Sequence, residues 1–97
     1  YELAIRALKR GHEVAIFLYL DAVWSMSSNI FTGKDRNIGE RFKELAAKGA
    51  QVRGCGLCAK YRGLKRDGVT ENTRLAGTAV LGEMIATSDR FLNFGLQ

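Results

Sequence analysis

The chain has 97 residues, a net charge of +5, no proline and a hydrophobic share of 46%. These values are typical of one small globular domain, so we expect residues 1–97 to form a single domain. Two cysteines are too few for the disulfide framework of a small secreted protein, and the longest apolar run, 14–20, is too short to cross a bilayer. We therefore expect a cytoplasmic protein that does not enter a membrane.

The first residues follow a helical pattern and lead into an apolar strand. Leu3, Ala7 and Leu8 fall on one helical face at the very start of a chain that does not begin with methionine, so we expect residues to be missing before it. Gly11 fits the position just after such a helix. Residues 13–20 are almost continuously apolar, which indicates a strand covered on both faces in a parallel sheet.

The rest of the chain alternates between helical and strand-like patterns. Irregular polar residues over 21–34 predict a mobile loop with room for a short helix at 22–24. The elements expected after it are a helix over 36–48, a strand over 50–54, a helix over 58–62, a weak strand over 69–75, a helix from 78 and a final strand over 91–94. This alternation predicts an α/β fold with helices on both faces of a parallel sheet.

Cys55 follows a predicted strand and precedes a predicted helix, which is where sites form in open α/β sheets. Gly54 and Gly56 flank it, and we expect them to let the backbone turn sharply and leave the sulfur exposed. Free N–H groups at the start of the next helix, together with the charges of Arg53, Lys60 and Arg62, favour the thiolate, which is the nucleophilic form of cysteine. Cys55 is therefore the candidate nucleophile.

Other residues near this junction have more than one interpretation. Cys58 lies about one helical turn after Cys55, so it could resolve a persulfide, form a disulfide with Cys55, or fill space as a small buried residue. Asp21 ends the preceding strand and is a candidate neighbour of the site, as is Arg62. The basic residues over 60–66 fit a solvated helix end better than a nucleic-acid patch.

Three other interpretations of the cysteine segment have less support. A thioredoxin-like site places a proline opposite its Cys-x-x-Cys motif, and the chain has no proline. A zinc site needs four ligands, and Cys55, Cys58 and distant His12 fall short of that within one chain. Residues 54–59 fit the Gly-x-Gly-x-x-Ala dinucleotide pattern, but no acidic residue follows at the required distance. We therefore predict neither a metal nor a cofactor.

Several short segments follow one another in a familiar order: Gly11-His12-Glu13-Val14, Phe17-Leu18, Asp21-Ala22-Val23, Cys55 with Arg62-Gly63 eight residues later, and Ser88-Asp89-Arg90 leading to Phe91 and Phe94-Gly95. In this order they resemble the second strand, the cysteine segment and the last strand of the DsrE/DsrF-like sulfur-relay family, which includes the TusD carrier. The added Cys58 is typical of a Cys-x-x-Cys branch of that family.

This resemblance implies a three-layer sandwich near flavodoxin in layout, without the family's first strand, that assembles as a trimer or hexamer. It implies sulfur transfer through a persulfide on Cys55, as a sulfurtransferase or a sulfur carrier. The partners would be donor and acceptor proteins or small polysulfides. Two alternatives stay open: a Cys-x-x-Cys redox protein, and an oligomeric binding module without catalysis, with RNA the less favoured ligand.

Overall fold

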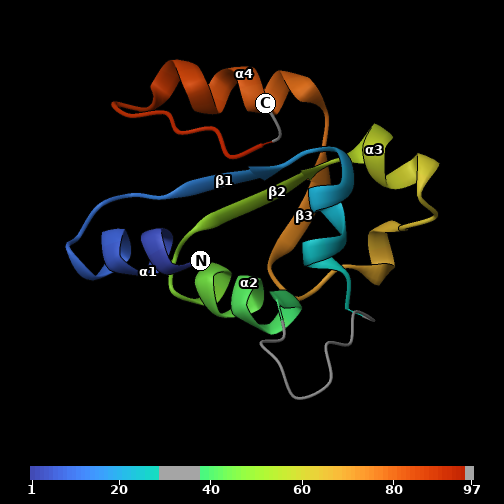
Figure 1. Cartoon of the computed structure of the whole chain (residues 1–97), viewed down its shortest axis with the longest axis horizontal. Helices are drawn as coiled ribbons and strands as arrows, with labels where there is room; N and C mark the ends of the chain where they lie inside the picture. The colour runs from blue at the N-terminus through green and yellow to red at the C-terminus, as the bar shows by residue number, and fades with distance from the viewer. Residues whose placement is uncertain (29–37, 96–97) are drawn as a thin grey trace.

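The computed structural model describes residues 1–28 and 38–95, and it contains a parallel sheet of three strands. The strand order is β1 (Ala15–Leu18), β2 (Gln51–Cys55) and β3 (Thr73–Ala76), with β2 in the middle (Figure 1). The predicted α/β fold with a parallel sheet is therefore confirmed. Of the loop predicted over 21–34, residues 21–26 belong to a 3-10 helix, and residues 29–34 lie outside the described residues.

One face of the sheet carries the main hydrophobic core. Side chains alternate between the two faces of a strand, so two rows across the sheet share this face: Ile16, Val52 and Thr73, then Leu18, Gly54 and Leu75. Three helical segments add side chains to this core: α1 (Glu2–Lys9), the 3-10 helix η1 (Leu20–Met26) and α2 (Ile38–Ala47). Val23, Met26 and Leu45 from these segments are completely buried.

Helix α1 ends where the sequence predicted. Gly11 has a φ of +83°, a left-handed conformation that a side chain would disfavour. The N–H of Gly11 donates to the carbonyl of Leu8 over 3.0 Å, and the N–H of His12 donates to that of Ala7 over 3.1 Å. These bonds satisfy carbonyls at the helix end and direct the chain into β1.

Helix α3 (Gly56–Tyr61) starts directly after β2, two residues earlier than predicted. Gly63, with a φ of +75°, ends this helical segment and turns the chain toward the short 3-10 helix η2 (Arg66–Gly68). Strand β3 is shorter than the weak strand predicted over 69–75, and Val69 instead forms an isolated antiparallel bridge with Ser27. In the described part of the chain, no helix is long and apolar enough to cross a membrane.

The opposite face of the sheet is covered less completely. Helix α4 (Thr78–Thr87) lies on the other side of the strands from α1 and α2, which gives the three layers that the family resemblance implied (Figure 1). Met84 is the one buried residue of α4. The final strand predicted over 91–94 is wrong: these residues form no strand, because a strand needs an adjacent strand to bond its backbone. The side chains of Phe91, Leu92 and Phe94 are exposed.

Candidate functional site: a cysteine pair at a strand–helix junction

Cys55 is both the last residue of β2 and the residue that caps the start of α3. The backbone N–H of Cys58 donates to the sulfur of Cys55, with 3.4 Å between nitrogen and sulfur. The first N–H groups of a helix have no partner within the helix, so a sulfur at this position takes the place of a capping side chain. The sequence prediction of a cysteine at a strand–helix junction is confirmed.

The surroundings of Cys55 favour its ionised form. Burial by itself raises the pKa of Cys55, because a thiolate loses hydration inside the protein. The N–H and the thiol of Cys58, the N–H of Leu57 and the positive charge of Arg62 together outweigh burial, so that the pKa of Cys55 lies below its usual value. A cysteine with a lowered pKa carries more of the nucleophilic thiolate at neutral pH.

Cys58 has the opposite tendency. Burial raises the pKa of Cys58, and the contact with the Cys55 sulfur raises it further, while the N–H of Leu20 and the charge of Arg62 act against this. The raised pKa of Cys58 favours its protonated form, whose thiol acts as a donor toward the sulfur of Cys55. Both cysteines are free, so the structure shows the pair as a dithiol.

The sequence predicted an exposed sulfur at Cys55, but the structure buries it. Cys55 is 2% exposed and Cys58 is 7% exposed, and both belong to the main core cluster. The reason is η1, which packs against α3 and the end of β2 and places Val23 and Met26 in the same cluster. A sequence pattern can locate the end of a strand, but it does not show that a segment far away in the chain will cover that end.

Asp21 and Arg62 meet beside the cysteines. The Nε of Arg62 donates to the Oδ1 of Asp21 over 2.8 Å, and its NH1 donates to the carbonyl of Cys58 over 3.0 Å. Arg62 thereby ties the first turn of η1 to α3. Both residues were predicted as possible site neighbours, and the structure brings them together.

The two glycines beside Cys55 differ from what the sequence suggested. Neither Gly54 nor Gly56 has a positive φ, so neither is required for a sharp turn. A Cβ at Gly54 would overlap the sulfur of Met26, whereas a Cβ at Gly56 would lie 3.5 Å from the carbonyl oxygen of Ala76. Gly54 is therefore needed for the close approach of η1 to β2, and Gly56 has room for a methyl group.

One contributor to the site was missed in the sequence. The backbone N–H of Leu20 faces Cys58 and lowers the pKa of that thiol, and the backbone of Leu20 is left-handed, with a φ of +53°. A leucine gives no sequence signal for this conformation, because non-glycine residues rarely adopt it. Arg53 and Lys60 were predicted to add positive charge near Cys55. In the structure, Arg53 donates to the carbonyl of Val52, and Lys60 lines a separate groove.

The described residues contain no group of three or more cysteine, histidine or acidic side chains that could hold a metal ion. The site is therefore built from two sulfurs, backbone N–H groups and one arginine. This set can stabilise a negative sulfur and bring a second thiol to it, which suits nucleophilic sulfur chemistry or dithiol oxidation.

Comparison with known proteins places the fold and the site in context. A family model described as the DsrE/DsrF-like family matches residues 1–94. The chain belongs to the DsrE/DsrF-like family. It is 33% identical over 91 residues to the uncharacterized protein MK0008 of Methanopyrus kandleri, covering 94% of this chain and 75% of that protein. It is 34% identical over 91 residues to the uncharacterized protein MJ0989 of Methanocaldococcus jannaschii, covering 94% and 80%.

The fold of this DsrE/DsrF-like chain is also that of a solved structure. The crystal structure of the ychN protein from E. coli matches with a TM-score of 0.84 over 96% of this chain and 80% of that one, at 22% sequence identity. At this identity the match establishes the shared fold.

Proposed function

We propose that the protein carries or transfers sulfur as a persulfide on Cys55. The observation that supports this most directly is the hydrogen bond that the N–H of Cys58 donates to the sulfur of Cys55 at the start of α3; with the N–H of Leu57 and the charge of Arg62 it lowers the pKa of Cys55 despite burial. Membership in the DsrE/DsrF-like family, the family of the sulfur-relay proteins, is consistent with the same chemistry.

In the proposed first step, the Cys55 thiolate attacks an outer sulfur of a polysulfide. The bond between that sulfur and the rest of the polysulfide breaks, and the shortened polysulfide leaves with the electron pair. Cys55 then holds the transferred sulfur as a persulfide anion, so charge is conserved. An acceptor thiolate can attack the outer sulfur in the same way and release the Cys55 thiolate.

Cys58 has a resolving role in this scheme. Its thiol can attack the inner sulfur of the persulfide, which forms a Cys55–Cys58 disulfide and releases the outer sulfur as hydrosulfide with the proton of Cys58. The contact between the two sulfurs, by which Cys58 donates to Cys55, supports this assignment. The donor reaches the buried sulfur when η1 moves away from α3.

The test is incubation of the reduced chain with sodium tetrasulfide, followed by intact mass measurement. We expect the added mass of one sulfur atom or more on Cys58→Ser and none on Cys55→Ser. The wild-type chain, in which Cys58 can release the sulfur, should gain sulfur or lose the mass of two hydrogens as the disulfide forms. If Cys58→Ser gains no sulfur, or if Cys55→Ser gains as much, the proposal is wrong.

A dithiol redox role is the second candidate, and the same sulfur contact favours it. It predicts a Cys55–Cys58 disulfide that forms reversibly in the range of cytosolic reduction potentials. Titration with mixtures of reduced and oxidised glutathione measures this, with Cys58→Ser as the control that cannot close the disulfide. Persulfide loading that persists in Cys58→Ser separates sulfur transfer from redox cycling.

A further inference from the structure

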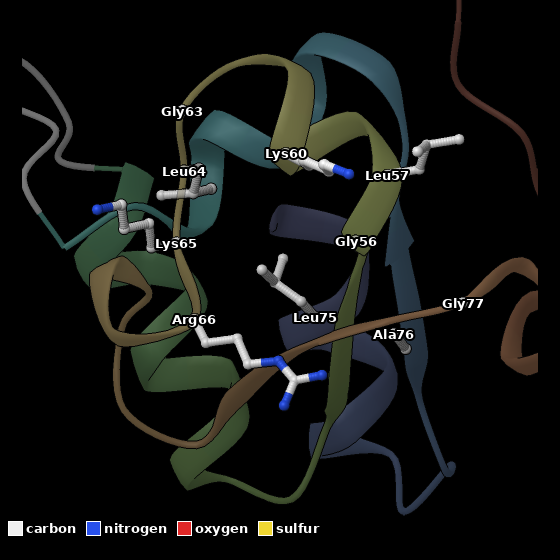
Figure 2. Close-up of a pocket in the computed structure, with 10 residues that line it drawn as sticks. All are labelled: Gly56, Leu57, Lys60, Gly63, Leu64, Lys65, Arg66, Leu75, Ala76 and Gly77. Atoms are coloured by element: carbon white, nitrogen blue, oxygen red, sulfur yellow. The ribbon is translucent and has the colours of Figure 1, made fainter.

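A second site lies on the other side of α3 from the cysteines. A groove of about 600 Å³ runs between α3, the segment leading into η2, and the end of β3 (Figure 2). Leu57 and Lys60 of α3 line it, whereas Cys58 and Arg62 of the same helical segment contact η1. The groove is therefore separate from the site around Cys55.

The side chains of this groove carry positive charge. Lys60, Lys65 and Arg66 line it, and in the part of the chain that the structure describes no aspartate or glutamate does. Arg66 extends toward the end of β3, near Leu75 and Ala76, whereas Lys65 points away from it (Figure 2). Among the described residues, neither Lys60 nor Arg66 forms an ion pair. The groove therefore offers a guanidinium and an ammonium group to a negatively charged ligand.

Aliphatic side chains form the rest of the groove. Leu57, Leu64 and Leu75 line it, and Leu57 is 60% exposed although it is a large apolar residue. A volume of this size is in the range of sites for small organic molecules and exceeds the need of a simple inorganic ion. The combination of two cations with a leucine surface specifies a ligand with one charged end and one apolar part.

We propose that this groove binds a small organic anion that joins a phosphate-like group to a short aliphatic body. Arg66 holds the anionic group, Lys60 adds a second positive charge on α3, and Leu75 contacts the aliphatic part (Figure 2). Because the groove lies on a different face of α3 from the sulfur of Cys55, this binding does not depend on the proposed sulfur chemistry.

The test is calorimetric titration of the full chain with n-hexyl phosphate, inorganic phosphate and n-hexanol. We expect hexyl phosphate to bind more tightly than either of the other two, because it alone satisfies both parts of the groove. We expect Arg66→Ala to weaken hexyl phosphate binding about tenfold or more, and Lys60→Ala to weaken it less, since lysine makes a single point contact. Lys65→Ala should have the smallest effect of the three.

Three controls decide the location and the independence of the site. Arg90→Ala removes an exposed cation elsewhere and should leave the affinity unchanged. Arg10→Ala alters a different basic groove along α1, and a larger loss there than in Arg66→Ala would overturn the proposal. Cys55→Ser should bind hexyl phosphate as the wild-type chain does, so failure here and failure of sulfur transfer are distinguishable. Absence of hexyl phosphate binding at millimolar concentration also overturns the proposal.

Discussion

The two faces of α3 form two different environments within one short helix. On the side of η1, Cys58 and Arg62 lie against a segment that buries the sulfurs and brings the backbone N–H of Leu20 to Cys58. On the side of the groove, Leu57 and Lys60 remain open to solvent. The comparison shows that donors at the start of α3 and the charge of Arg62 lower the pKa of Cys55, whereas coverage by η1 buries its sulfur and opposes that shift.

The difference also has an electrostatic side. Near Cys55, the guanidinium of Arg62 already donates to the carboxylate of Asp21 and to the carbonyl of Cys58. These two hydrogen bonds fix its position in the protein. In the groove, Lys60 and Arg66 make no ion pair within the part of the chain that the structure describes, so their charge is available to a ligand. The first site is organised for a reacting atom of the protein, and the second for an anion from outside.

The largest change in stability is expected when a methyl group is added where η1 packs against β2. Gly54→Ala places a Cβ against the buried sulfur of Met26, and we expect it to lower the free energy of unfolding by roughly 1–3 kcal/mol, as overpacking does. Urea denaturation measures this. Gly56→Ala, on the groove side, is the matched control and should be neutral or stabilising by up to about 1 kcal/mol, because alanine favours a helix over glycine. Equal losses in both variants would contradict the difference between the faces.

A smaller effect is expected when the contact between η1 and α3 is weakened. Asp21→Asn removes the ion pair with Arg62. The carboxylate of Asp21 in this pair is exposed to solvent. We expect alkylation of the cysteines by iodoacetamide to become about 2- to 5-fold faster at fixed pH, because an exposed pair contributes up to roughly 1 kcal/mol. Asp89→Asn, an exposed acid in the C-terminal segment, is the control. An unchanged rate in Asp21→Asn would show that this pair does not hold η1 in place.

The smallest effect concerns the backbone at the start of η1. Leu20→Gly removes the steric strain of a left-handed backbone at a residue with a side chain, but it also makes the unfolded chain more flexible. The first contribution is the larger, so we expect a net stabilisation of about 0.5 kcal/mol. Thermal and urea unfolding measure it. Tyr19→Gly is the matched control, because Tyr19 is extended with a φ of −126°, and that change should destabilise the protein. Destabilisation in both variants would mean that Leu20 is not strained.

Much of the fold could be predicted because its signals are local. The continuous apolar run before Asp21 identified β1, and Gly11, Gly49 and Gly63 have the positive φ values expected where helical segments end. The final strand was predicted wrongly at 91–94, because a strand pattern does not supply a neighbouring strand.

At the site, sequence patterns identified the residues but not their coverage. Cys55, Cys58, Asp21 and Arg62 were all singled out, and the structure brings them together. The burial of the sulfurs was missed, because it depends on a contact between segments far apart in the chain. The left-handed Leu20 was missed for the same kind of reason, since tertiary packing imposes that conformation on an ordinary residue.

The pH dependence of Cys55 alkylation tests the central claim most directly. Iodoacetamide modification of Cys55 and Cys58 is measured by peptide mass spectrometry across a pH series, for the folded chain and for the chain in urea. Because folding lowers the pKa of Cys55, its midpoint should lie at lower pH in the folded chain than in urea, and the midpoint of Cys58 should lie at higher pH. The stability that ionised Cys55 contributes is then present above its unfolded pKa and is lost as the pH falls through its folded pKa. A folded midpoint for Cys55 equal to or above the unfolded one would contradict the account.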